Sequence, residues 1–333
     1  MIGYIVRRVI MAVFTVWTIT ILAFFIIQLP EGDTVTKYLD DLMTRGDPVS
    51  MEIVDNLREY FGLNQPMHVR YYKWVTNMLQ GDLGFSYRYF CGGAREKLVK
   101  ELIGERIQMT VVLTGFTILV TWTFAIPVGI YSAVRQHSVG DYFFTFIGFS
   151  GLAVPDFLLG LVLMYMAFAY FNQSVGGLNS ADYINEPWNL DRILDLLNHL
   201  WIPAIVLGTS GTASLIRIMR NNLLDELSRP YVVTASAKGM TPWKLILKYP
   251  VRVAINPLVS TVGYLLPTLV SGSVIVSVVL SLPTLGPVLL NSMIQQDVYT
   301  AGFIVLMLGI LTIIGTLLSD LLLAVVDPRI KYT

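Results

Sequence analysis

The clearest pattern along the chain is a series of six long apolar stretches separated by polar segments. Each is long enough to cross the hydrocarbon core of a bilayer as a helix, which takes about 20 residues. The stretches cover about residues 9–29, 107–133, 143–171, 200–216, 256–280 and 300–326. This pattern predicts an all-α integral membrane protein with six transmembrane helices.

The first polar segment is the longest, so a large loop is predicted after the first transmembrane helix. Within this loop, helical pieces are expected at residues 50–61 and 67–80. The second piece carries a stripe of three aromatic residues, Tyr71, Tyr72 and Trp74. Such stripes usually lie at the level of the lipid headgroups or pack on the membrane helices.

These boundaries divide the chain into four parts. Residues 1–30 are an N-terminal segment with the first helix, and residues 31–106 are the outer segment. Residues 107–326 are a five-helix core that includes a long polar loop at 217–252, and residues 327–333 are a tail.

The placement of basic residues predicts the orientation. With the N-terminus inside the cell, Arg7, Arg8 and Arg135 face the cytoplasm, together with seven basic residues of the 217–252 loop. The short outer connections hold Arg192 alone. Because lysine and arginine concentrate in short cytoplasmic loops, both termini and the 217–252 loop are predicted to be cytoplasmic.

Composition narrows the function classes. The formal net charge is zero, so no overall field favours binding to nucleic acid. The single cysteine, Cys91, excludes an internal disulfide and is interpreted as a small loop residue. The three histidines, His68, His137 and His199, are scattered in loops, so neither a metal site nor a catalytic cluster is predicted.

Four of the predicted spans contain proline, at Pro127, Pro155, Pro203 and Pro267. Proline kinks a membrane helix and frees a backbone carbonyl that neighbouring groups must satisfy. Kinks occur both in transporters that move and in static bundles, so the prolines alone do not distinguish between them.

Between the fourth and fifth predicted spans lies a polar hairpin, Tyr231-Val-Val-Thr-Ala-Ser-Ala-Lys-Gly-Met-Thr-Pro-Trp243. Pro230 suits the first turn of a helix, and Gly239 can adopt the positive φ that ends one. Thr241 and Pro242 then suit the N-cap and the first position of a second helix. The sequence therefore predicts two short helices that face water.

The surface of this hairpin has two interpretations. Residues 234–237 are small, so the backbone of another protein could approach closely, and Lys238 suits the end of a helix. Trp243 and residues 245–247 give the second helix an apolar side. The hairpin is either a docking surface for another protein or an amphipathic loop that rests on lipid.

The hairpin also carries a resemblance. The segment from Tyr231 to Gly239 is similar to Tyr-Val-x-Thr-Ala-x-Ala-Lys-Gly, the cytoplasmic loop motif of ABC importer permeases of the dipeptide/oligopeptide family. Further matches to this family follow in order: Tyr4-Ile-Val-Arg-Arg8, Gln28-Leu-Pro-Glu-Gly-Asp33, Gly81-Asp-Leu-Gly84, Glu105-Arg106, Val154-Pro155 and Asp327-Pro-Arg-Ile330. Over nearly its whole length, the chain resembles the first (B-type) permease subunit of such systems.

The resemblance implies a subunit of an ATP-driven importer in a bacterial or archaeal cytoplasmic membrane. Its implied partners are a second homologous permease, two ATPase subunits or domains that hold ATP and Mg, and an external binding protein that delivers peptides. No cofactor is implied for this chain. The implied ATPase-coupling residues are Tyr231, Thr234, Ala235, Ala237, Lys238, Gly239 and Pro242.

The sequence departs from the family pattern at four places. Tyr249-Pro-Val-Arg252 stands where His-x-Leu-Arg is usual, and Asn256-Pro257 stands for Ile-Pro. These two changes concern the elbow of the coupling loop. Pro283-Thr-Leu-Gly286 stands for Pro-Gly-Leu-Gly, and Gln296-Asp297 for Arg-Asp. The latter two concern the outer gate and hence the substrate. Members of the resembled family are also associated with sugar uptake, so oligosaccharides remain an alternative cargo for the same machinery.

Other classes of membrane protein lack support in the sequence. There is no Gly-x-x-x-x-Gly-Lys-Ser/Thr phosphate loop, so ATP would have to be hydrolysed by a partner. Neither His-Glu-x-x-His nor Gly-x-Ser-x-Gly is present, which disfavours an enzyme. An ion-coupled secondary transporter, the more distant alternative, usually shows intramembrane charge pairs or inverted repeats, and neither is evident.

Two acidic residues fall within the predicted spans. Asp320 lies near the inner interface, whereas Asp156 lies about 15 residues, or roughly 22 Å, into the third span. A carboxylate at that depth should face a polar cavity or a partner. We expect Asp156, with Pro155, to line the translocation path and contact a cationic or hydroxyl-rich group. The alternative is a carboxylate that is paired within the bundle or protonated.

Overall fold

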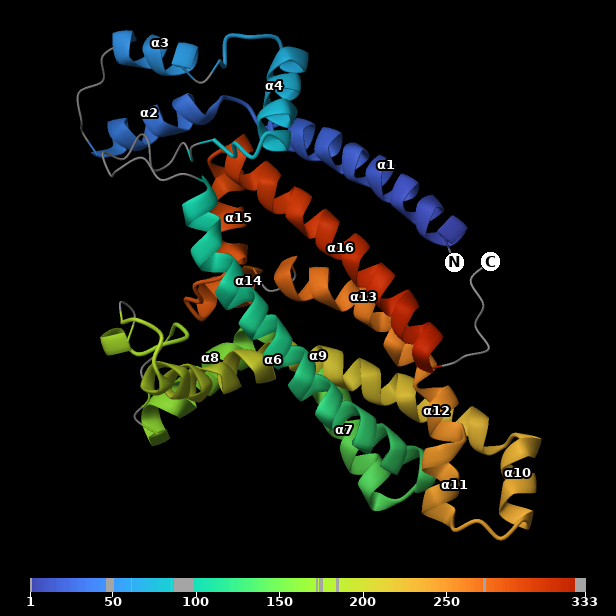
Figure 1. Cartoon of the computed structure of the whole chain (residues 1–333). Coiled ribbons are helices and arrows are strands. Elements are labelled where there is room, and N and C mark those ends of the chain that lie inside the picture. Colours follow the sequence, from blue (N-terminus) through green and yellow to red (C-terminus); the bar gives the residue numbers. More distant parts are fainter. Residues whose placement is uncertain are drawn as a thin grey trace. The chain divides into compact units, whose positions relative to one another are not determined.

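The computed structural model of the 333-residue chain describes residues 2–45, 51–60, 62–84, 86, 99–171, 173, 176–183, 186–271 and 274–326. Within these ranges it contains helices and no strand, which confirms the all-α prediction (Figure 1). Cys91, the match at 327–330 and the tail lie outside the described residues. The chain forms two compact units, residues 1–109 with 284–311 and residues 110–283 with 312–333.

The first unit combines the long helix α1 (Ile2–Ile27) with several shorter helices and the N-terminal parts of two more long helices. It also contains α2 (Thr34–Arg45), α3 (Met51–Tyr60), α4 (Met67–Leu79) and α15 (Leu285–Ile294), with the first turns of α6 (Val99–Val134) and α16 (Val298–Val326). Helices α3 and α4 confirm the two helical pieces predicted for the outer segment, while α2 was not predicted.

The aromatic stripe of α4 packs on the membrane helices of this unit. Trp74 is buried against Phe24 of α1 and Ala301 of α16, and the Tyr71 hydroxyl lies 2.9 Å from Thr20 Oγ1. A methyl group at Gly302 would come within 2.5 Å of the Trp74 ring, so glycine is required for this close approach. Of the two predicted environments for the stripe, Tyr71 and Trp74 thus adopt the packed one.

Polar contacts hold the remaining loops of the first unit. Asp297 is buried and accepts hydrogen bonds from Ser86 Oγ at 2.7 Å and Thr300 Oγ1 at 2.8 Å. Gln296, one of the departures from the family pattern, donates from Nε2 to the carbonyl of Pro30 at 2.7 Å. Asp33 is partly buried, which opposes ionisation, but hydrogen bonds from Thr36 and the nearby Arg58 hold the pKa of that carboxyl below its ordinary value.

The second unit is assembled around one long helix, α9 (Leu190–Leu227). Helices α7 (Val139–Ala153), α8 (Asp156–Phe171), α12 (Pro250–Ala254), α13 (Asn256–Ser271) and α14 (Val274–Val279) all pack against α9. The unit also holds the short helices η1 (Ala181–Tyr183), α10 (Pro230–Ala237) and α11 (Pro242–Lys248). Its central core joins α6, α9, α12 and α13 through Ala125, Met219, Leu223, Ala254 and Leu258.

In the part of the chain that the structure describes, four helices are long and apolar enough to cross a membrane: α1, α6, α9 and α16. The third predicted span is instead divided into α7 and α8, whose axes differ by 104°. The break falls at Val154 and Pro155, because a residue before proline is driven out of helical conformation. The fifth predicted span is represented by α13 and α14, so the count of six remains a prediction.

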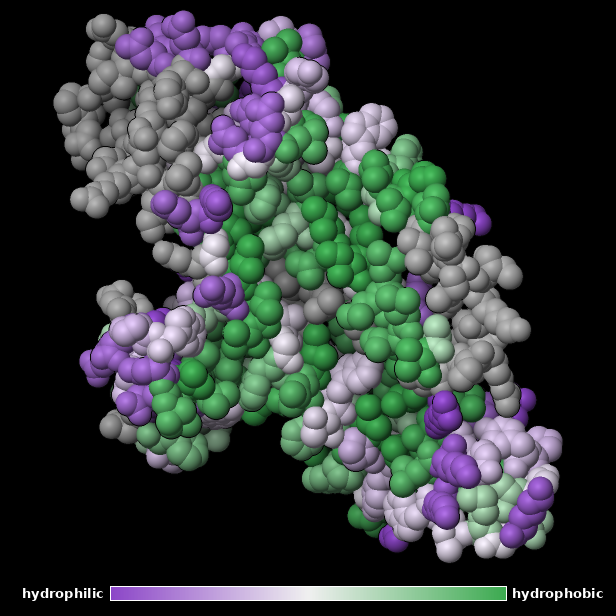
Figure 2. All heavy atoms as spheres, viewed as in Figure 1, coloured by the Kyte–Doolittle hydropathy of each residue, from purple (hydrophilic) through white to green (hydrophobic). Residues whose placement is uncertain are grey.

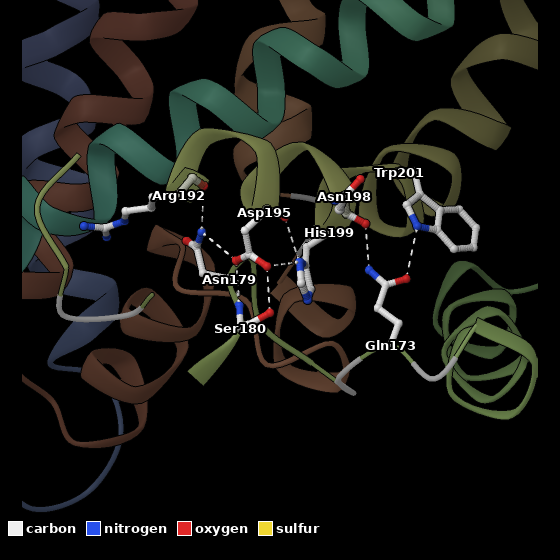
Figure 3. A network of polar contacts seen from close by, with 8 residues as sticks. All are labelled: Gln173, Asn179, Ser180, Arg192, Asp195, Asn198, His199 and Trp201. Atoms are coloured by element: carbon white, nitrogen blue, oxygen red, sulfur yellow. Dashed lines mark hydrogen bonds and ion pairs between the residues drawn. The ribbon is translucent and has the colours of Figure 1, made fainter. Parts of the chain in front are cut away.

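The connection between α8 and α9 is fastened by a polar network (Figure 3). Asp195 of α9 accepts hydrogen bonds from Ser180 N at 2.8 Å and Ser180 Oγ at 2.6 Å. Gln173 donates to the carbonyl of Asn198 at 2.6 Å and accepts from Trp201 Nε1 at 3.3 Å. Helix α9 therefore begins ten residues before the predicted span at 200–216, in a polar stretch that hydropathy assigns to a loop.

Candidate functional site

The hairpin of α10 and α11 forms as its sequence predicts. Pro230 occupies the first turn of α10, and Gly239 has a φ of +80° just after the helix ends. Pro242 opens α11 with Thr241 at the N-cap position. The Thr241 side chain makes no capping hydrogen bond; its carbonyl accepts from Leu245 N at 3.0 Å instead. The two short helices lie side by side at one end of the second unit (Figure 1).

The hairpin has a small apolar core of its own. Val232 and Ala235 of α10 are buried against Leu245 and Ile246 of α11. This core continues onto the helices of the unit through Ile130 and Val134 of α6, Leu227 of α9 and Val251 of α12. Ala235 therefore supports the hairpin from inside, which differs from the expectation that it offers surface to a partner. Ala235 is only 9% exposed.

The remaining predicted coupling residues lie on the hairpin surface. These exposed residues are Tyr231, Thr234, Ala237, Lys238, Gly239 and Pro242. Three large apolar side chains accompany them, Val233, Trp243 and Leu247, each more than half exposed. An open groove of about 580 Å³ runs between the helices, with Ser236, Ala237 and Met240 among its lining residues. Figure 2 shows hydrophilic side chains beside hydrophobic ones on this part of the molecule.

Glu226 connects the hairpin to the end of α9. It accepts a hydrogen bond from the Tyr231 hydroxyl, and its carboxylate lies 3.6 Å from Arg229 Nε. Sequence reasoning selected Tyr231 and missed Glu226, because nothing in the local pattern distinguishes this acid from others on α9. The contact gives Tyr231 a structural part in holding the start of α10.

Pro155 and Asp156 lie at the break between α7 and α8. Asp156 is the first residue of α8 and is partly buried, while Pro155 is exposed. An acid in the first turn is favoured by the helix dipole. The described residues provide no hydrogen bond or ion pair to the Asp156 carboxylate. The predicted depth of roughly 22 Å assumed one straight helix at 1.5 Å per residue, which the 104° bend contradicts.

The two groups of predicted site residues are not brought together. The hairpin follows the C-terminal end of α9, whereas α8 packs beside Val206, near the middle of α9. Among the described residues, no group of three or more His, Cys, Asp or Glu side chains is placed to hold a metal ion.

A buried ion pair was missed by the sequence analysis. Asp141 of α7 is 2% exposed and accepts from Arg220 Nε at 3.0 Å and Arg220 Nη2 at 2.9 Å. The backbone N–H of His137 donates to the same carboxylate at 3.0 Å. Ser138 caps α7 by accepting from Asp141 N, so a Ser-x-x-Asp spacing at a helix start was the available signal.

Comparisons with known proteins match almost the whole chain. Residues 125–332 match the family described as binding-protein-dependent transport system inner membrane component, and residues 1–114 match the N-terminal family of the same transport systems. The oligopeptide transport system permease protein AppB of Bacillus subtilis is 34% identical over 333 residues, the full length of both chains. A putative peptide permease of Brucella ovis is 32% identical over 337 residues, again covering both chains fully. The dipeptide transport system permease protein DppB of Escherichia coli is 28% identical over 348 residues, covering all of this chain and 99% of its own.

Proposed function

The chain belongs to the inner-membrane components of binding-protein-dependent transport systems, and we propose that it is one permease subunit of an ATP-driven peptide importer. It is a transport component rather than an enzyme. Peptides are the proposed cargo because relatives aligned over their whole length are named as oligopeptide and dipeptide permeases. An external binding protein would deliver the peptide, and a second homologous permease would complete the path through the membrane.

The observation that carries this function is the α10–α11 hairpin. Its apolar core anchors it to α6, α9 and α12, and its outer surface presents small and large apolar side chains next to lysines. A surface of this kind suits the cleft of another protein, since exposed apolar patches with polar rims mark interaction sites. The hairpin is the docking site of an ATPase subunit, which holds ATP and Mg, and a second ATPase docks on the partner permease.

The remaining parts of the proposal concern the membrane. Six transmembrane helices, with both termini in the cytoplasm, place the hairpin on the ATPase side. The α7–α8 break lies along the translocation path, where Asp156 contacts a cationic or hydroxyl-rich group of the cargo. Its carboxylate has no partner among the described residues, which supports this role. Unchanged uptake kinetics in an Asp156→Asn variant that assembles normally would contradict it.

The docking role is tested by co-purification. A tagged chain is expressed in its native host, solubilised gently and isolated, and the proteins that accompany it are identified. The test variant is Gly239→Arg, and the matched control is Gly81→Arg. Both glycines have φ near +80°, and at both an added Cβ would meet no atom within 4 Å, so the two variants carry similar backbone strain. Gly81 lies in the first unit, away from the hairpin in sequence.

We expect the unsubstituted chain and Gly81→Arg to recover ATPase subunits and a second permease. Gly239→Arg should lose the ATPase subunits and keep the second permease, because only the hairpin surface is altered. Equal recovery in all three preparations would remove the docking role. A chain that purifies alone and moves solute without ATP would remove the importer function itself.

A further inference from the structure

A pocket of about 470 Å³ lies between α7 and α9, apart from both the hairpin and the α7–α8 break. Helices α7 and α9 pack along one another in the second unit (Figure 1). Its polar and charged groups gather around the contact of Asp141 with Arg220. Two turns further along α7, where Gly148 lies beside Ala213, the lining is mainly apolar.

The polar end carries a net positive charge. Arg217, Arg220 and Asp141 line it, so the formal charges of these three side chains sum to one positive charge. Asp141 neutralises Arg220 through two hydrogen bonds of 3.0 and 2.9 Å. Arg217 supplies the remaining charge. Its guanidinium lies 5.0 Å above the ring of Phe149, and among the described residues it forms no ion pair.

The apolar end lies beside exposed aromatic side chains of α7. Phe149, Ala213 and Ile216 line this part of the pocket. Phe149 is 56% exposed, and Phe146, one turn earlier on α7, is 71% exposed. Large aromatic side chains exposed on a helix of a membrane protein are suited to contact with lipid.

We propose that this pocket binds one anionic phospholipid, with the phosphate at Arg217 and an acyl chain along Phe149 and Ile216. A guanidinium stacked on an aromatic ring keeps its donors free for a phosphate, and its flat shape matches two phosphate oxygens. Basic pockets between membrane helices are known to hold acidic headgroups. A free anion would use the polar end and leave the apolar wall without a partner.

Native mass spectrometry of the full chain, purified with its partners, tests the proposal. The protein is exchanged into nanodiscs of phosphatidylcholine with increasing phosphatidylglycerol, and the retained phosphatidylglycerol is counted after release. Arg217→Gln removes the charge, and Arg217→Lys keeps it. Arg135→Gln is the matched control, because Arg135 is an exposed basic residue that does not line the pocket.

Arg217→Gln should weaken phosphatidylglycerol retention about fivefold, the effect of one basic residue near an anionic lipid. Arg217→Lys should retain most of the binding because it keeps the charge. Arg135→Gln should change it less than about twofold, because salt screens a charge that does not contact the bound lipid. An equal loss of phosphatidylglycerol retention in all three variants would mean that surface charge in general attracts the lipid, and it would overturn the proposed site. A loss of phosphatidylglycerol in Arg217→Lys as large as in Arg217→Gln would also overturn the site. Displacement of the lipid by inorganic phosphate alone would overturn it too, as would the finding that a partner protein covers the pocket and excludes lipid.

Discussion

At the scale of single residues, the Asp141–Arg220 pair joins α7 to α9 through a buried carboxylate. Asp141 is almost completely buried, whereas the Arg220 side chain is 23% exposed. A buried carboxylate without its partner is strongly destabilising, although the intact pair itself contributes little net stability. The pair therefore fixes how α7 lies on α9 more than it strengthens that packing.

This view predicts the outcome of removing one partner. Arg220→Met should lower the free energy of unfolding by about 3 kcal/mol, the lower end of the range for a broken buried pair, because Arg220 is partly exposed. Arg229→Met, which breaks the more exposed pair with Glu226, should cost less than about 1 kcal/mol. Denaturant titration in detergent provides the measurement.

The double variant Asp141→Asn with Arg220→Met supplies the control for this prediction. Removing the charge of Asp141 should recover part of the stability that Arg220→Met loses, because no unpaired ion is then buried. If the double variant instead has a lower free energy of unfolding than Arg220→Met, the unpaired charge of Asp141 is not the cause of the destabilisation.

At the scale of elements, the α7–α8 bend makes a measurable distance prediction. Spin labels at Tyr142 and Tyr165, both exposed, should lie about 20 Å apart across the bend, against about 35 Å along one straight helix. The labels require a Cys91→Ser background, since Cys91 is the single cysteine of the chain.

Pro155→Ala should shift the label distances toward the longer value, because alanine permits residue 154 to remain helical. Pro203→Ala is the matched control: Pro203 lies inside the uninterrupted α9, so its removal should leave the distances unchanged. A Pro155→Ala variant that keeps the short distance would show that packing on α9, rather than proline, maintains the bend.

Local signals predicted some elements well and others poorly. The hairpin follows from Pro230, Gly239 and Pro242, whose backbone preferences act within a few residues. The start of α9 was missed because its first residues are polar, and contacts such as Asp195 with Ser180 stabilise them from outside the helix. The burial of Ala235 was also missed, since the side of α10 that faces Ile246 depends on tertiary packing.

At the scale of the whole molecule, the proposed orientation is testable by labelling from one side of the membrane. In the Cys91→Ser background, Lys238→Cys places a thiol on the hairpin and Asp191→Cys places one at the start of α9. Both parent residues are exposed. In intact cells, a membrane-impermeant maleimide should label Asp191→Cys, and Lys238→Cys should react only after permeabilisation, because basic loops stay in the cytoplasm. The reverse pattern would invert the topology.

The anchoring of the hairpin has a mechanical consequence. Its apolar core touches three helices through Ile130, Leu227 and Val251, so force applied to the hairpin is shared among α6, α9 and α12 at once. Close-packed interiors deform little, so the hairpin and these three helix ends should move together as a stiff lever. A hairpin on a flexible linker could be displaced without moving the helices. A rigidly packed hairpin cannot, so its displacement should move the ends of α6, α9 and α12 by a similar amount.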